Sequence, residues 1–194
     1  MSPVPTDEIY EKYRDKAILE INALADEIAR AAGGRVPVLG SGHPLGDIML
    51  LKYRPQPAEV QEGVAFYGRS GQAILKSLQR LHVDPLAIYG TNCLKFAEGD
   101  EDESRPFLTR ELHIVQPKLI VAMGHPTVEI LNSIDFPLAD RLEPTSAEVQ
   151  RFTATVDAIV VPDIDASLDE APAKTAFWNA FKAVGPWWAA LPPY

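Results

Sequence analysis

Two cations on either side of a tyrosine, Lys52 and Arg54, follow an apolar run that is typical of a buried strand. Cationic side chains at such a position could bind the phosphates of a nucleic acid or a nucleotide. Three further cations could join them: Arg69, Lys95 and Arg105. The alternative is that Lys52 and Arg54 are ordinary loop charges in water. Their partners would then be Glu59, Glu62 or Asp163.

Carboxylates gather after the last apolar run, at Asp163, Asp165, Asp169 and Glu170. Oxygen ligands of this kind bind divalent cations. They are also typical of a solvated turn before a helix, because the helix dipole favours negative charge at its start. We expect the solvated turn here and no metal site.

The chain has a single cysteine, Cys93. One cysteine excludes an internal disulfide and cannot by itself hold a zinc ion or an iron–sulfur cluster. Because no histidine is close to it in sequence, we expect a small buried side chain rather than a nucleophile. The sequence therefore predicts no cofactor.

The composition is that of one folded domain over residues 1–194, with 46% hydrophobic and 23% charged residues. No apolar run approaches the roughly 18 residues that cross a bilayer, and the first residues lack the pattern of a signal peptide, so we expect a cytoplasmic protein without a membrane partner. The net charge of −9 weakens attraction to phosphates. DNA, a nucleotide and a protein all stay open as partners.

Strand-like and helical segments alternate along the chain. After an amphipathic helix over 6–32, strands are predicted at 47–53, 87–95, 118–124 and 156–161. Helices are predicted at 68–81, 105–116, 125–132 and 171–188. This order predicts a three-layer α/β/α sandwich with a central, mostly parallel four-stranded sheet. Ligands bind beyond the carboxyl ends of such strands, which directs attention to the segments after Leu51, Thr91, Met123 and Val161.

Three segments are less regular. The stretch over 135–155 is either a hairpin or a strand that continues into the last one. The acidic run Glu98 to Glu103 is predicted to be a flexible surface loop. The last helix is expected to end near Gly185 and Pro186, and an aromatic tail follows, which either covers the first helix or forms a dimer surface: Trp187, Trp188 and Tyr194.

Three ordered segments resemble the family 4 uracil-DNA glycosylases, over about residues 47–182. They are EGVAFYGRSGQAILKSL from Glu62, GTNCLKF from Gly90, and RPFLTRELHIVQPKLIVAMGHPTVEIL from Arg105. The resemblance implies the fold of this superfamily and base-excision repair of DNA. It also implies that Phe66 stacks on an extruded base and that Asn92 hydrogen-bonds the base's Watson–Crick edge. Without the resemblance, Phe66 is a core aromatic and Asn92 caps a loop.

The catalytic positions of the family carry other residues. Its Gly-Glu-Ala-Pro-Gly motif falls on Lys52 to Gln56, which puts Tyr53, a poor base at neutral pH, at the water-activating position. The family's second motif begins with a histidine, and Asp163 occupies that position. An ionised aspartate opposes the negative charge that develops on a departing base. His43 and His125 stand at the wrong place in the order, and His125 is expected to start the helix after the third strand. Phe96 stands where the family has one cysteine of its iron–sulfur cluster.

These residues leave three hypotheses. The first is a glycosylase with altered catalytic groups, in which Asp163, Asp165 or Glu59 orients water and the substrate is a base other than uracil. The second is a protein that binds nucleic acid or a nucleotide through Lys52, Arg54, Phe66 and Asn92 without cleavage. The third is a protein-interaction module that keeps only the fold. In all three, conventional uracil excision is not expected.

Overall fold

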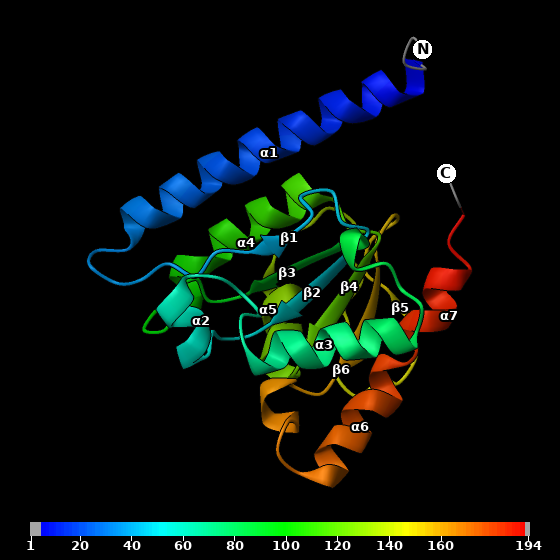
Figure 1. Cartoon of the computed structure of the whole chain (residues 1–194). Coiled ribbons are helices and arrows are strands. Elements are labelled where there is room, and N and C mark those ends of the chain that lie inside the picture. The colour runs from blue at the N-terminus through cyan, green and yellow to red at the C-terminus, as the bar shows by residue number, and fades with distance from the viewer. Residues whose placement is uncertain (1–4, 193–194) are drawn as a thin grey trace.

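The computed structural model describes residues 5–192 (Figure 1). Its centre is a six-stranded sheet with the order β1-β3-β2-β4-β6-β5. The strands are β1 (Ser41–Gly42), β2 (Ile48–Lys52), β3 (Ile88–Asn92), β4 (Leu119–Met123), β5 (Gln150–Arg151) and β6 (Asp157–Val161). The four longer strands, β2, β3, β4 and β6, run parallel, and the two-residue strands pair antiparallel at the edges. The α/β class is confirmed. The predicted count of four strands omits these two edge strands, since two residues carry no readable pattern.

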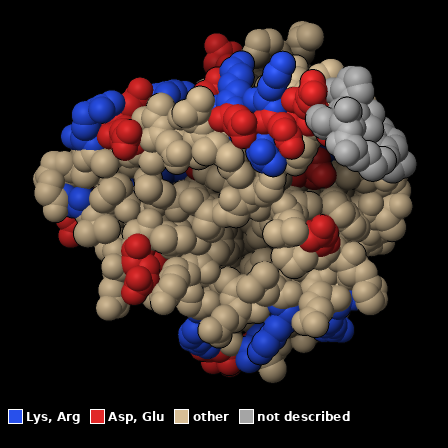
Figure 2. Space-filling view, turned by 45° about the horizontal axis from the view of Figure 1, so that its top comes forward, with Lys and Arg blue, Asp and Glu red and all other residues tan. Residues whose placement is uncertain are grey.

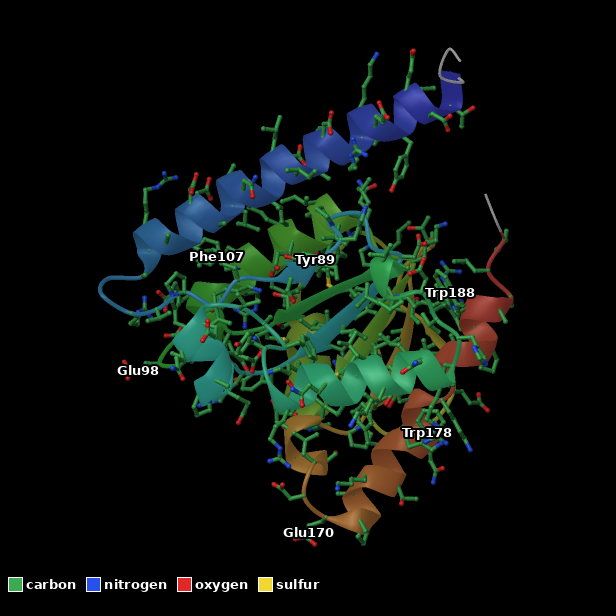
Figure 3. The ribbon with its side chains drawn as sticks, viewed as in Figure 1. Tyr89, Glu98, Phe107, Glu170, Trp178 and Trp188 are labelled. Atoms are coloured by element: carbon green, nitrogen blue, oxygen red, sulfur yellow. The ribbon has the colours of Figure 1, made fainter. Side chains whose placement is uncertain are left out.

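Helices cover both faces of the sheet. They are α1 (Pro5–Ala31), α2 (Pro57–Glu62), α3 (Arg69–Arg80), α4 (Glu101–Val115), α5 (His125–Ser133), α6 (Ala171–Phe181) and α7 (Val184–Ala189), with single 3-10 turns at Pro85–Ala87 and Asp165–Ser167. Helices α3, α6 and α7 share one apolar cluster with the sheet, and α4 and α5 share another. Helix α1 lies outside α4, and Phe107 of α4 packs against the apolar side of α1 (Figures 1 and 3).

Two boundaries differ from the sequence-based expectation, and one alternative that the sequence left open is decided. Helix α4 begins at Glu101, inside the run predicted to be a loop, because the Asp100 carboxylate accepts a hydrogen bond from the Glu103 backbone N–H at 2.8 Å and caps the helix. Gly185 does not end the last helix but lies in α7, a new helix in which proline at position 186 is tolerated in the first turn. Between 150 and 161 the hairpin forms, as β5 and β6.

The expected aromatic tail is described only in part, since Tyr194 lies outside the described residues. Trp187 and Trp188 pack on the cluster of α3, α6 and α7, rather than on α1. One domain for the whole chain stays a prediction. None of the described helices combines the length and the apolar character needed to span a membrane.

Alternation along the strands decides which side chains can meet at the carboxyl edge. In β2, Leu50 faces α3 and α6, whereas Leu51 faces α4 and α5. Lys52 therefore shares the α3 side with Leu50, and Tyr53 packs on the opposite side. In β3, Gly90 lies against Phe66, which places Asn92 on that same side.

Candidate functional site

The ammonium of Lys52 lies at the carboxyl end of β2 and is completely buried. Its Nζ donates to Glu59 Oε2 at 2.6 Å and to the Arg54 carbonyl oxygen at 3.0 Å, and it lies 3.0 Å from Asp165 Oδ2. An ammonium has three donors, and each has a protein acceptor here. A buried cation is tolerated only with such pairing, because it has lost its hydration.

Glu59 supplies the central carboxylate, and it is also completely buried. Helix α2 starts with Pro57, and Glu59, its third residue, reaches back so that Oε2 accepts from the Gln56 backbone N–H at 2.7 Å. Its other oxygen, Oε1, accepts from the Phe66 backbone N–H at 2.6 Å and from Asn92 Nδ2 at 3.3 Å. With Lys52, four donors saturate the carboxylate.

Phe66 sits in a tightly fitted backbone position with φ of +60°. This conformation is uncommon for a residue with a side chain, and it turns the Phe66 N–H toward Glu59. Two glycines make room: a Cβ on Gly71 would lie 1.9 Å from the Phe66 carbonyl oxygen, and a Cβ on Gly90 would lie 2.7 Å from Phe66 Cδ2. The Lys52 ammonium is 5.6 Å from the centroid of the ring, within the range of a cation–π contact.

The side-chain amide of Asn92 is buried at the end of β3. Its Nδ2 donates to Glu59, whereas its Oδ1 has no hydrogen-bond partner among the described residues. A buried polar atom without a partner is costly and calls for an explanation. The amide therefore presents an acceptor that the protein itself does not use.

Together these groups form a candidate recognition site, in which Asn92 Oδ1 has no partner among the described residues. A donor and an acceptor on one amide, a backbone N–H and an aromatic ring are the groups that hold a flat base with a carbonyl and a ring N–H. In this structure the two donors, on Asn92 and Phe66, are both occupied by Glu59 Oε1. The carboxylate thus stands where the carbonyl of a bound base would accept.

Comparison with known proteins assigns the chain to a family. A model of the uracil DNA glycosylase superfamily matches residues 39–182. The chain belongs to the uracil-DNA glycosylase superfamily. The matched region contains every residue of the site described above.

Two type-4 uracil-DNA glycosylases are similar to this superfamily member. The protein of Sulfurisphaera tokodaii is 29% identical over 105 residues, which cover 50% of this chain and 48% of that one. The protein of Archaeoglobus fulgidus is 23% identical over 159 residues, which cover 76% of this chain and 80% of that one. The chain thus spans about half the length of the first relative. The predicted superfamily membership, with similarity to family 4, is confirmed.

Tyr53, which the resemblance predicts to stand at the water-activating position, points away from Asn92 and Phe66. Its hydroxyl donates to Glu101 Oε1 at 2.7 Å, and its ring packs with the cluster of α4 and α5. Burial, followed by the hydrogen bond to Glu101, raises the pKa of Tyr53 to about 12. Neither the position nor the acidity of the phenol suits a base that activates water. Glu59 and Lys52, rather than Tyr53, fill the space beside Asn92.

Asp163, at the expected histidine position, is exposed and caps its own loop, since Oδ1 accepts from the Asp165 backbone N–H at 3.0 Å. The carboxylate that reaches the site is Asp165, two residues later, with its side chain 11% exposed. Burial raises the pKa of Asp165, and the neighbouring Lys52 ammonium acts in the opposite direction. Asp165 therefore gives Lys52 a second carboxylate partner beside Glu59.

The five cations predicted to bind phosphate do not gather at one place. Lys52 has no donor left for a phosphate in this arrangement. Lys95 is buried on the α4 side, where its Nζ donates to Thr91 Oγ1 at 2.8 Å, to the Asn92 carbonyl oxygen at 2.6 Å and to Glu111. Arg54 and Arg69 are exposed, and Arg69 pairs with Asp169 at 2.6 Å. Arg105 pairs with Asp102 on α4, at 2.7 Å.

The residues do not fit the iron–sulfur cluster of the similar family. Phe96 is fully buried against the apolar side of α1, and the Arg35 guanidinium lies 4.1 Å from its ring centroid. Cys93 faces the other cluster, with α4 and α5, and its burial raises the pKa of the thiol to about 12. Within residues 5–192 no group of three or more His, Cys, Asp and Glu side chains could hold a metal ion. In the Asp163 to Glu170 segment, Asp163 caps its own loop, Asp165 pairs with Lys52 and Asp169 pairs with Arg69.

The role of Glu59 has one signal in the sequence. Gln56 and Glu59 have the spacing of a capping box before a short helix, which predicts that the glutamate folds back toward the chain. Its other contacts, to Phe66, Asn92 and Lys52, depend on how separate segments pack.

Proposed function

We propose that this protein is a DNA-repair-related member of the uracil-DNA glycosylase superfamily that does not carry out conventional uracil excision. The supporting observation is that Glu59 Oε1 accepts from both Asn92 Nδ2 and the Phe66 N–H, at 3.3 and 2.6 Å. The resemblance assigns the Asn92 amide to the edge of the extruded base and the Phe66 ring to its face, and the Phe66 N–H lies beside them. A base can use them only after Glu59 leaves.

Displacement of Glu59 is energetically unfavourable. The carboxylate has four hydrogen-bond donors, and one of them is the buried ammonium of Lys52. Separating one partner from a buried ion pair costs about 3–5 kcal/mol. The flipped base would have to supply this free energy in addition to its own unstacking, which costs a few kcal/mol.

The chemistry beyond base binding is also unsuited to uracil release. Tyr53 is on the far side of the sheet, so it cannot orient water at a base that stacks on Phe66. Asp163 and Asp165 place carboxylates at the edge where a departing base would gain negative charge. Ionised carboxylates raise the energy of such a transition state.

The test is release of uracil from single-stranded and duplex oligonucleotides at low salt, which favours binding by an acidic protein. The type-4 enzyme of Archaeoglobus fulgidus is the positive control. We expect no abasic sites above the level without protein. Uracil release by the pure protein that disappears in Asn92→Ala would overturn the proposal.

A glycosylase with altered chemistry is the second candidate, and the unpartnered Oδ1 of Asn92 favours it. If Glu59 swings out, that oxygen accepts from a base N–H, Lys52 stabilises negative charge on the base, and Asp165 orients water. The substrate is then a modified base other than uracil. A panel of modified-base oligonucleotides tests this candidate. Base release must be lost in both Asn92→Ala and Asp165→Asn.

DNA, a nucleotide or a protein as the partner stays a proposal, as does a cytoplasmic location. A module that acts only through protein contacts is favoured if neither DNA nor nucleotides bind and a purified partner does.

A further inference from the structure

A basic hollow lies between α3 and α6, beside the site described above. Its volume is about 300 Å³. Four cations line it, and no Asp or Glu does so within residues 5–192: Arg69, Lys76, Arg80 and Lys174. In a chain with a net charge of −9, such a concentration of positive charge is unexpected. The hollow is therefore a candidate for binding anions.

The geometry of α3 explains how the cations meet. Arg69, Lys76 and Arg80 are separated by seven and four residues, so they project from one side of the helix. Lys174 faces them from the first turns of α6. In Figure 2 a group of mainly blue side chains lies at the lower edge of the molecule, the side on which α3 and α6 lie in Figure 1.

Most of this charge is not neutralised by the protein. Arg69 pairs with Asp169 at 2.6 Å, and both side chains are largely exposed. Lys76, Arg80 and Lys174 are exposed and form no ion pair with a described residue. Their charges are therefore available to a ligand.

A flat surface accompanies the cations. The Arg80 guanidinium lies 3.8 Å from the centroid of the Trp178 ring, and Trp178 stands on α6 beside the end of α3 (Figure 3). Nucleic-acid bases stack on aromatic rings and on guanidinium planes. The side chains of Gln72 and Ser77 add hydrogen-bonding groups to the wall.

We propose that this hollow binds nucleotides, with phosphates at Lys76 and Lys174 and a base against the Arg80–Trp178 pair. Both a free nucleotide and a single strand of nucleic acid offer this chemistry. From Arg69 to Arg80 the helix rises about 16 Å, enough to follow more than one phosphate of a strand. The hollow uses neither Asn92 nor Phe66, so it operates with the base site closed.

The experiment measures fluorescence anisotropy of two probes, labelled oligothymidylate and a labelled nucleoside triphosphate, with the full chain. Lys76→Ala/Lys174→Ala is the test variant. Lys12→Ala/Lys16→Ala is the matched control, because it removes two exposed lysines of α1 and changes the net charge equally. Arg80→Lys keeps the charge but removes the planar group.

We expect the oligothymidylate affinity to fall about 20- to 50-fold between about 50 and 200 mM salt, as for three to four phosphate contacts. The Lys76→Ala/Lys174→Ala variant should weaken binding and reduce the slope of log K against log salt by about 1.4. The control variant should bind within about twofold of wild type, since its charges are distant. Arg80→Lys should weaken binding and leave the slope unchanged.

The two probes identify the source of the nucleotide. Binding of the oligonucleotide alone indicates a strand, and binding of the triphosphate alone indicates a free nucleotide. The proposal is overturned if neither probe binds, or if Lys76→Ala/Lys174→Ala and the control variant weaken binding equally. It is also overturned if polyglutamate binds as well as either probe, because the hollow then recognises only negative charge. Failure of both probes to bind the hollow would not affect the proposal on uracil excision, because that proposal is tested by the release of uracil.

Discussion

Replacement of Lys52 by methionine removes one charge from the buried pair with Glu59 and keeps most of the side-chain volume. Both side chains of the pair have zero exposure, and their charged atoms are 2.6 Å apart. The carboxylate of Glu59 would remain buried with three neutral donors and no cation. Breaking a buried pair in this way costs about 3–5 kcal/mol. For a chain of this size we expect the Tm to fall by about 6–20 °C.

The assay is urea unfolding at neutral pH, with the free energy of unfolding obtained by linear extrapolation. The control is Lys16→Met, whose lysine is 72% exposed and lies 3.8 Å from Glu20. We expect that variant to stay within about 0.5 kcal/mol of wild type.

A double-mutant cycle separates the ion pair from the volume of the side chains. In Lys52→Met/Glu59→Gln the fully buried carboxylate is removed together with its cation, and only Asp165, with its side chain 11% exposed, loses a partner. The double variant should therefore be more stable than the sum of the single changes by about 0.5–3 kcal/mol. The reasoning is refuted if Lys52→Met costs less than about 1 kcal/mol, or if the two changes simply add. A Lys52→Met variant too unstable to fold, next to a double variant that folds, supports it.

Three further results are expected. Burial raises the pKa of Tyr53 to about 12, so the free energy of unfolding should fall as pH rises from about 10 to about 12. Tyr53→Phe should reduce that fall, whereas Tyr10→Phe, at an exposed site, should not. Equal alkaline unfolding curves for all three proteins would contradict the assignment. Gly90→Ala should lower the free energy of unfolding by about 1–3 kcal/mol, because the added Cβ would overlap the ring of Phe66. Gly99→Ala, whose Cβ would have its nearest contact at 3.4 Å, should lower it by less than half as much in the same urea titration. Cys93 should react with a thiol reagent only after unfolding, since its thiol is buried with a pKa of about 12; rapid labelling of the native protein would show that the strand end opens.

The fold could be read from the sequence because its signals are local. Buried parallel strands appear as short apolar runs, and each is followed by a helix with a clear apolar side. The start of α4 has a signal in the sequence, because an aspartate followed by acidic residues, as at Asp100, is typical of a helix N-terminus. The same acidic run also predicts a surface loop, and that prediction is wrong for residues 101–103. The edge strands are too short to leave any pattern.

The site could be read only in part, because its contacts join distant segments. The resemblance assigns Phe66 and Asn92 to one base-binding site, and in the structure both hydrogen-bond to Glu59. The partners of Lys52 are harder to predict, since a lysine at a strand end is usually solvated. Its second carboxylate partner, Asp165, comes from a loop more than a hundred residues later. The choice between Asp163 and Asp165 depends on the turn after β6, which no periodicity determines.

The carboxylate of Glu59 is covalently tethered to the site in which it binds, so any base that enters competes with an intramolecular ligand. A short tether gives an effective concentration in the millimolar range or above, and it does not change with the amount of DNA. Dilution, which releases an ordinary inhibitor, has no effect on such a competitor. A free base would therefore need to exceed that concentration, or bind correspondingly more tightly, before Asn92 and Phe66 could hold it.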